Sequence, residues 1–224
     1  RGAPPEQGKL IDPSTSERKS RNTDNFYTWI IDNSPRWKRF PKRSRSFICT
    51  NREEIAQNYS GFGDANVVVP IGNPVIGITD QADFWLSFPY LKSQADVHEL
   101  SDLNSVLNSL YREYFGVDLR HVAKSWPELV AAFAQLTKLN LTPDTVRSLG
   151  SDWRDEMIKG LLKHGPDLLK TIDALLSPHK NQIKVDTVSN LAKYRAYTQE
   201  LWISAPCYNV NVLDWERDWK ELLL

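Results

Sequence analysis

Residues 40–61 read FPKRSRSFICTNREEIAQNYSG and bring together basic side chains, hydroxyl groups and a short apolar run. The run from Ser46 to Cys49 is typical of a short buried strand. Asn51 precedes Glu54 by three residues, which is the spacing of a capping box and predicts a helix that ends near Gly61. This stretch therefore predicts a strand that leads directly into a helix, with positive charge upstream of the strand.

The positive charge is local, because the chain as a whole is neutral. Its 224 residues include 28 lysines and arginines and 28 aspartates and glutamates, so the molecule has no general attraction for polyanions. Residues 34–52 nevertheless carry seven basic side chains and no acidic one: Arg36, Lys38, Arg39, Lys42, Arg43, Arg45 and Arg52. This basic cluster fits a solvated loop, a pocket whose arginines fork onto a phosphate, or a surface for single-stranded nucleic acid. Nucleic acid is the partner we expect least, because no known reader motif is present.

The composition is that of a globular protein, with 41% hydrophobic and 25% charged residues. The length suits one large domain or two modest ones. The two cysteines lie far apart and the four histidines are isolated, so we expect neither a disulfide framework nor a metal site. No apolar run is long enough to span a membrane, and no signal peptide is visible. The abrupt start at Arg1 leads us to expect a piece of a longer chain.

The first half of the chain carries strand signals. Residues 26–31 fit either a strand or one helical turn, and the β-branched runs 67–69 and 75–78 predict two strands that are neighbours in a sheet. Residues 84–91 are rich in aromatic side chains and predict an extended segment, with Pro89 at an edge or an end. This half therefore predicts a small unit that mixes strands with a helix.

Beyond Ser93 the pattern changes to that of helices. Apolar residues at helical spacing predict a helix that ends at Gly116: Leu103, Val106, Leu107, Leu110 and Tyr114. Caps and breakers predict further helices at residues 125–139, 142–150, 152–163, 167–176 and 186–202, and one that begins at Asp214. The sequence thus predicts an α+β fold, with a small mixed α/β domain at residues 1–92 and an all-α helical domain at residues 93–224.

Two carboxylates follow the second β-branched run, in the stretch ITDQADFW (residues 78–85). At the end of a strand, Asp80 or Asp83 could act as an acid, a base or an electrostatic stabiliser. An aspartate at such a place can equally cap a turn. The two residues are the acidic candidates of the first half.

The order of these features resembles the mono-ADP-ribosyltransferase fold of bacterial toxins, effectors and phage enzymes, over roughly residues 1–90. Those enzymes bind NAD in a cleft between two small antiparallel sheets. Their motifs are an arginine on a first strand, a hydroxyl-bearing strand that leads into a helix, and an acidic residue on a later strand. Here Arg1-Gly2 resembles the end of the first motif, and residues 46–51 resemble the hydroxyl-bearing strand.

The resemblance implies two split antiparallel sheets and a set of site residues. Asp83, Arg1 and Thr50 would be catalytic, and Asp83 would stabilise the oxocarbenium-like transition state. NAD, the substrate that donates ADP-ribose, would be held by Arg1, Arg43, Ser44, Ser46, Thr50 and Tyr59. The family normally has a glutamate as its acidic residue, often in a Glu-x-Glu or Gln-x-Glu pair, and residues 80–83 contain neither.

The implied activity is transfer of ADP-ribose from NAD to a side chain of an acceptor protein, which the helical part would select. The enzyme would act in the cytoplasm of its producer or in a host cell that receives it. The alternatives are a catalytically inactive protein of the same fold, and a protein-binding helical module whose basic cluster steers the encounter. The sequence does not indicate the oligomeric state.

Overall fold

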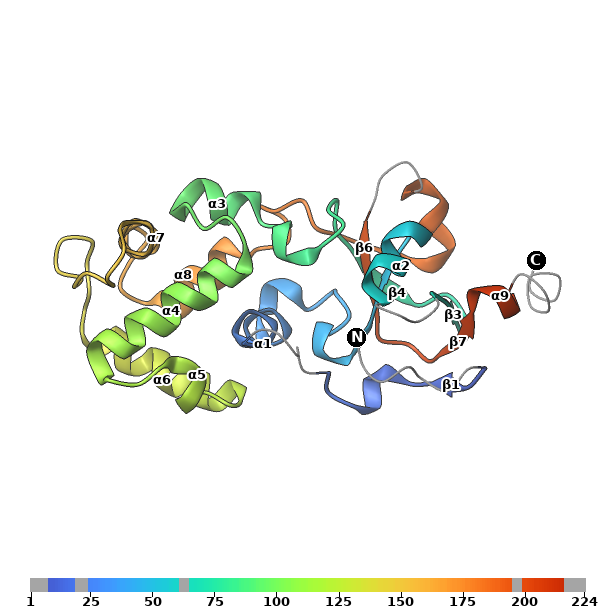
Figure 1. The fold of residues 1–224 in the computed structure, drawn as a ribbon, viewed down its shortest axis with the longest axis horizontal. Coiled ribbons are helices and arrows are strands. Elements are labelled where there is room, and N and C mark those ends of the chain that lie inside the picture. The colour runs from blue at the N-terminus through green and yellow to red at the C-terminus, as the bar shows by residue number, and fades with distance from the viewer. Residues whose placement is uncertain (1–7, 19–23, 61–64, 195–198, 216–224) are drawn as a thin grey trace. The chain divides into compact units, whose positions relative to one another are not determined.

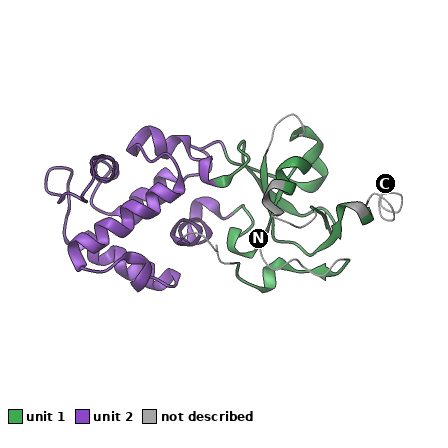
Figure 2. Cartoon of the chain, in the orientation of Figure 1, with its two compact units in different colours: residues 1–18, 39–84, 183–224 green, residues 19–38, 85–182 purple. Residues whose placement is uncertain are grey.

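The computed structural model describes residues 8–18, 24–60, 65–194 and 199–215, and of residues 58–60 and 213 it describes the backbone alone. The described strands form two antiparallel sheets, and the remaining regular structure is helical, so the fold class is α+β. The chain divides into two compact units (Figure 2). Unit 1 comprises residues 1–18, 39–84 and 183–224, and unit 2 comprises residues 19–38 and 85–182.

Unit 1 contains both sheets (Figure 1). The first has the strand order β1–β7–β3, made of Leu10–Ile11, Cys207–Asn211 and Asn66–Pro70. The second has the order β2–β6–β4–β5, made of Phe47–Thr50, Glu200–Ile203, Val75–Ile78 and Lys184–Thr187. Strands from the C-terminal part of the chain thus pair with strands from its first half in both sheets.

An apolar cluster in unit 1 joins the two sheets. Its buried members come from β4, β6 and β7: Ile76, Ile78, Leu201, Ile203 and Cys207. Val68 of β3 packs against the cluster. Because β3 and β7 belong to one sheet while β4 and β6 belong to the other, the cluster is a core shared by both sheets.

The other face of β6 is covered as well. The ring of Trp202 stacks on Phe40, with a centroid separation of 6.0 Å, and meets Phe84 edge-on at 5.4 Å. On the neighbouring strand β4, Gly77 lies opposite Trp202, and a Cβ atom there would come within 2.0 Å of the indole ring. Strand β6 is therefore buried on both faces.

Short helices complete unit 1. The α-helices are α2 (Glu53–Ser60) and α9 (Val212–Asp214). The 3-10 helices are η1 (Pro13–Thr15), η3 (Arg43–Arg45), η5 (Val188–Tyr194) and η4 (Phe84–Leu86), of which η4 runs on into the first residues of unit 2.

The regular structure of unit 2 is helical throughout its described residues. It comprises α1 (Phe26–Asn33), η2 (Pro35–Trp37), α3 (Pro89–Ala95), α4 (Leu100–Phe115), α5 (Leu119–Val122), α6 (Trp126–Lys138), α7 (Asp152–Leu162) and α8 (Leu168–Leu175). Helix α4 begins with a capping box between Glu99 and Asp102 and ends at Gly116, whose φ of 74° suits a glycine. Helices α3 and α7 approach closely, because a Cβ atom on Gly160 would lie 2.8 Å from the Cα of Ala95.

Several predictions of local structure are confirmed. The strand near residues 46–49 is β2, and the helix that follows it is α2. The predicted helices near residues 103–114, 125–139, 152–163 and 167–176 are α4, α6, α7 and α8. Residues 26–31, which fit either a strand or a helix by sequence, belong to α1.

Other predictions are wrong, for reasons that lie outside the local sequence. Strands β3 and β4 are not neighbours, because β7 and β6 separate them into different sheets. Residues 84–91 are not extended, because they form η4 and the start of α3. Pro89 lies in the first turn of α3, where a backbone N–H would have no partner within the helix, so the missing N–H of proline costs no hydrogen bond. Residues 142–150 form a turn rather than a helix.

The segment 186–202 is not one helix. It contains the end of β5, the 3-10 helix η5 and the start of β6, and both strands pair with β4. The sheet therefore overrides the helical pattern of this stretch. The chain also does not divide near residue 92. Residues 183–215 belong to unit 1, together with the strands of the first half, and residues 24–38 belong to unit 2, together with the later helices.

Candidate functional site

Among the described residues of unit 1, Glu200 is the most enclosed carboxylate, and it lies at the first position of β6. Its Oε1 accepts a charge-assisted hydrogen bond from Nη2 of Arg43, and its Oε2 accepts from the backbone N–H of Phe84 at 3.0 Å. Its own backbone N–H donates to the carbonyl of Gln81 at 2.8 Å, and its carbonyl accepts from the N–H of Thr79 at 3.0 Å. The chain after β4 thus wraps around Glu200 and holds its carboxylate in place.

The hydroxyl-bearing strand lies directly beside this carboxylate. In the antiparallel pair of β2 and β6, Thr50 faces Glu200. Residues that face each other in such a pair project their side chains from the same side of the sheet, about 5 Å apart. The Thr50 hydroxyl also accepts from the backbone N–H of Arg52 at 3.2 Å, where β2 turns toward α2. A residue with a hydroxyl and a residue with a carboxylate are thereby neighbours on one side of the sheet, at one end of β2 and β6.

Arg43 is buried beneath this site. Its side chain is 4% exposed, and its guanidinium carbon lies 3.9 Å from the ring centroid of Phe84 and 5.5 Å from that of Trp202. Cation–π contact and the ion pair with Glu200 compensate for the loss of water around the charge. Because its Nη2 is engaged by Glu200, Arg43 is placed to fix that carboxylate.

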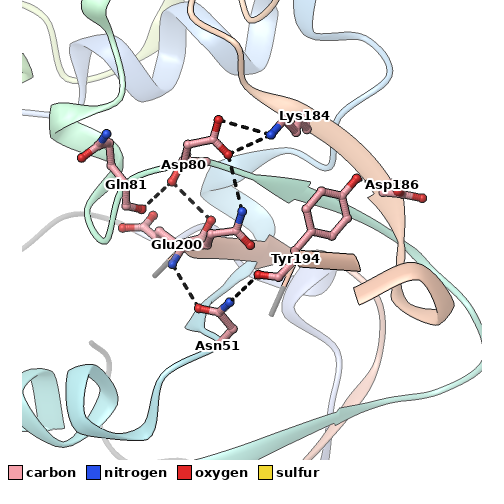
Figure 3. Close-up of polar contacts among 9 residues, drawn as sticks. Asn51, Asp80, Gln81, Lys184, Asp186, Tyr194 and Glu200 are labelled. Atoms are coloured by element: carbon pink, nitrogen blue, oxygen red, sulfur yellow. Dashed lines mark hydrogen bonds and ion pairs between the residues drawn. The ribbon is translucent and has the colours of Figure 1, made fainter. Parts of the chain in front are cut away.

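A second polar group surrounds Asp80, and Figure 3 shows its contacts. Lys184 of β5 donates to both carboxylate oxygens of Asp80, at 2.9 and 3.2 Å. The side-chain amide of Gln199 donates to Asp80 at 3.5 Å, and the backbone N–H of Gln199 donates to Asn51 at 3.0 Å. These bonds tie the start of α2, the end of β4 and the start of β6 together.

Gln199 and Tyr194 extend this second group. Gln199 is fully buried, and within the described part of the chain the carbonyl oxygen of its side chain has no hydrogen-bond partner. The Tyr194 hydroxyl donates to Asp186 at 2.7 Å, and this bond holds the pKa of Asp186 below its usual range. The side-chain oxygen of Gln199 is therefore a buried acceptor without a donor among the described residues.

The residues predicted for the site are only partly brought together. Thr50 and Arg43 both lie beside Glu200, and Asp83 directly precedes the Phe84 amide that binds it. The Ser46 hydroxyl donates to the carbonyl of Lys42 at 2.7 Å, and Ser44 is buried in η3. The Ser46 hydroxyl therefore stabilises the turn before β2, in which Ser44 is buried.

Two predicted residues are beyond what the structure describes. Arg1 falls in residues 1–7, outside the described residues, and Tyr59 lies in α2 at a position where only the backbone is described. Their predicted roles toward NAD stay predictions.

Sequence reasoning missed Glu200, the carboxylate on which the other groups converge. The pattern of its segment predicts a helix, which places no acidic residue on a strand there. The signal that could have found it is the run Leu201-Trp202-Ile203, followed by Pro206, which is typical of a short buried strand. A carboxylate at the head of such a run would have been a third acidic candidate, beside Asp80 and Asp83.

Several residues of the basic cluster bind partners within the unit to which each of them belongs. Arg36 pairs with Asp173 at 3.1 Å in unit 2, Arg45 donates to the carbonyl of Ser14 at 2.7 Å in unit 1, and Arg43 is buried. The exposed basic residues of the cluster include Lys38, Arg39 and Lys42. Positive charge available to a partner is therefore smaller than the sequence count suggests.

Among the described residues, no group of three histidines, cysteines, aspartates or glutamates could hold a metal ion, and no helix is long and apolar enough to cross a membrane. No protein-family model matches the chain, and neither does any curated protein or solved structure. The geometry around Glu200 is therefore the basis on which a function can be assigned.

Proposed function

We propose that the chain is an NAD-dependent protein mono-ADP-ribosyltransferase, or a domain of one, with Glu200 as its acidic residue. The observation that carries the proposal is the pairing of Thr50 with Glu200 across β2 and β6. A hydroxyl-bearing strand beside a strand with an acidic residue is the arrangement expected of this family. Two small antiparallel sheets in one unit, as expected for a family that binds NAD between such sheets, also support it.

In this proposal Glu200 takes the role first expected of Asp83. Asp83 lies between β4 and η4 and belongs to neither. Glu200 is a glutamate, as the family prefers, and stands on a strand beside the hydroxyl-bearing strand. Arg43 then serves to position Glu200 rather than to bind NAD, and Arg1 stays the proposed arginine for NAD.

The proposed chemistry breaks the bond between C1′ of the ribose and the nicotinamide nitrogen. Nicotinamide leaves with the bonding electron pair, and positive charge develops on the ribose. A carboxylate held in advance beside that charge lowers the barrier without having to reorganise. A nucleophilic side chain of the acceptor protein then adds to C1′ and releases its proton. Arg43 and the Phe84 amide supply the rigid support that such a carboxylate needs.

The test measures nicotinamide release from NAD and transfer of labelled ADP-ribose to a mixture of acceptor proteins. We expect Glu200→Gln to lower nicotinamide release by roughly 10²-fold or more, the scale of removing one electrostatic stabiliser, while calorimetry still detects NAD binding. Glu54→Gln is the matched control, because Glu54 is an exposed glutamate of α2, and we expect it to leave the rate unchanged.

Two results would remove the proposal or its assignment of residues. A wild-type protein that neither binds NAD nor releases nicotinamide would show that the chain is not such an enzyme. If Asp83→Asn abolishes release and Glu200→Gln, verified as folded by circular dichroism, does not, then Asp83 rather than Glu200 is the acidic residue.

The second candidate is a non-catalytic protein-binding module, and one observation favours it. The charges of Arg43 and Glu200 satisfy each other, and their side chains are only 4% and 11% exposed, as in a pair that serves stability alone. Under this reading the helical unit binds a protein partner. Partner binding would then survive Glu200→Gln in folded protein and be lost on changing exposed residues of unit 2.

A further inference from the structure

Unit 2 has an open pocket at its surface, the cavity, with a volume of about 330 Å³. All the residues that line it belong to the helical unit, so the cavity is separate from the site around Glu200. They are Asp24, Ser101, Asn104, Ser105, Asn108, Ser109, Arg112, Asp118, Arg120 and Arg154. Every one of these side chains is polar or charged, whereas ligand pockets are usually lined mainly by apolar groups.

One wall of the cavity is a polar face of α4. Ser101, Ser105 and Ser109 recur at intervals of four residues, which places them on one side of a helix. Asn104 and Asn108 lie beside them, and both are more than nine-tenths buried. Residues 103, 106, 107 and 110 supply the apolar face of the same helix. Helix α4 is therefore buried partly through polar side chains that face the cavity.

The cavity wall carries a surplus of positive charge. Arg112 and Arg120 both bind Asp118, and Arg120 does so at 3.2 Å through Nε and 3.0 Å through Nη2. Arg154 contributes a third guanidinium, whose buried Nε has no hydrogen-bond partner within the described part of the chain. Against three arginines stand two aspartates, Asp24 and Asp118, which leaves one positive charge in excess.

A buried acceptor is also left without a donor. The Nδ2 of Asn104 donates to the backbone carbonyl of Asp24 at 3.2 Å, and this bond fixes which end of the amide is the oxygen. That oxygen, Oδ1, is buried and has no hydrogen-bond partner among the described residues, although Asn104 is only 5% exposed. A buried acceptor without a donor is costly, and a ligand with a hydroxyl group could satisfy it.

We propose that this cavity binds a small hydroxylated oxyanion, such as a sugar phosphate or a sugar acid. Guanidinium groups of the wall bind the phosphate or carboxylate, for which their planar N–H donors are suited. A ligand hydroxyl donates to Oδ1 of Asn104, and the serine hydroxyls of α4 accept or donate to the others. The volume lies within the range of small-molecule sites, at its lower end, which suits a ligand of this size.

The experiment is calorimetric titration of the full chain at constant ionic strength with four probes. Ribose 5-phosphate and gluconate carry both an anionic group and hydroxyls, ribose lacks the anion, and sulfate lacks the hydroxyl. We expect ribose 5-phosphate, gluconate or both to bind, and ribose and sulfate to bind at least about tenfold more weakly; which anion binds better identifies phosphate or carboxylate as the preferred group.

Two variants locate the binding. Arg154→Gln removes one guanidinium, and Ser105→Leu fills the cavity from α4; each is expected to weaken binding about tenfold or more. Arg147→Gln is the matched control, because Arg147 lies on the same unit, outside the cavity, with a side chain that is 65% exposed. The proposal fails if no anionic probe binds, or if binding is unchanged in both cavity variants. Binding of sulfate as tight as that of ribose 5-phosphate would overturn the role given to Asn104.

Discussion

Arg43 is buried, although the basic residues around it in the sequence predict exposed positive charge. It belongs to a run of basic residues that predicts a wet loop or a phosphate pocket. In the structure it is buried, with Glu200 on its guanidinium and aromatic rings beside it. A buried charge depends strongly on its partner, so the energetics of this pair can be measured.

Arg43→Met keeps an unbranched side chain against the rings and leaves the Glu200 carboxylate without its cation. We expect it to lower the free energy of unfolding by about 3–5 kcal/mol, the cost of an uncompensated buried charge. In the double variant Arg43→Met/Glu200→Gln the loss should be smaller than the sum of the two single losses, with a coupling of about 0.5–3 kcal/mol. Urea unfolding of the four proteins measures it.

Lys42→Met is the matched control, because Lys42 is the exposed neighbour in sequence and its loss should stay within about 0.5 kcal/mol. Strict additivity of the Arg43 and Glu200 substitutions would contradict the pairing.

Of the residues that form the candidate site, the sequence predicted only some. The strand that carries Thr50 could be predicted because it is apolar and directly precedes a helix cap, and the family resemblance then implied a role for its hydroxyl. Glu200 was missed because it gains its surroundings from residues 43, 50 and 84, which are distant in sequence. A local pattern cannot report partners of that kind, so the hydroxyl was predictable and the carboxylate was not.

At the scale of elements, helices α4 and α6 followed from apolar spacing and end signals because both are local properties. Strand neighbours did not follow. The two runs that became β3 and β4 look alike in sequence, yet pair with different strands. Pairing depends on which faces are buried together, and β6 is buried on both faces, so its pattern does not alternate.

Close contact between α3 and α7 depends on Gly160. Alanine is normally favoured over glycine in a helix by about 1 kcal/mol. Here the added Cβ would meet the Cα of Ala95 at 2.8 Å, against backbone that cannot rotate away. We therefore expect Gly160→Ala to lower the free energy of unfolding, by about 1–3 kcal/mol, despite its better helix propensity.

Chemical denaturation of Gly160→Ala measures the change, with Glu156→Ala as a control on the same helix, since the Glu156 side chain is 66% exposed. A Gly160→Ala protein more stable than the wild type would mean that the helices separate at no cost.

At the scale of the whole molecule, the α+β class was predictable from composition and periodicity, whereas the division into units was not. The predicted boundary near residue 92 assumed that each domain is continuous in sequence. Both units are instead assembled from separated segments. The pattern of apolar and polar residues changes where the type of secondary structure changes. A compact unit can begin or end at other positions.

Both units contain carboxylates whose pKa is lowered by folding, and this predicts acid sensitivity of the whole chain. In unit 2, the hydrogen bond from Arg112 lowers the pKa of Asp118, and that from the Ser148 hydroxyl lowers the pKa of Asp155. In unit 1, Tyr194 does the same for Asp186. A lowered folded-state pKa contributes stability above the ordinary value near 4, and this stability is lost as the pH falls through the folded pKa.

Two thiols lower the stability of the folded chain at alkaline pH. Burial raises the pKa of Cys49 to about 12 and that of Cys207 to about 11. A raised folded-state pKa contributes stability below the ordinary thiol value of about 8.5, and this stability is lost as the pH rises above it. We therefore expect a plateau of stability between about pH 4 and pH 8.5.

Urea unfolding at a series of pH values checks this expectation. Asp118→Asn should flatten the acid limb, and Asp144→Asn, an exposed aspartate of unit 2, should not. Stability that rises as the pH falls from 4 to 3 would contradict the expected loss of stability in acid.

The position of β6 between β2 and β4 has a consequence for the order of events during synthesis. The ribosome makes residues 47–78 early, then the 98 consecutive residues of unit 2 between 85 and 182, and only afterwards the strand that joins β2 to β4. The helices of unit 2 can fold before β6, the strand that lies between β2 and β4, has been synthesised. Glu200 meets Thr50 and Arg43 only when nearly all of the described chain has left the ribosome, so a truncated product that lacks β6 would contain the helices but no assembled carboxylate site.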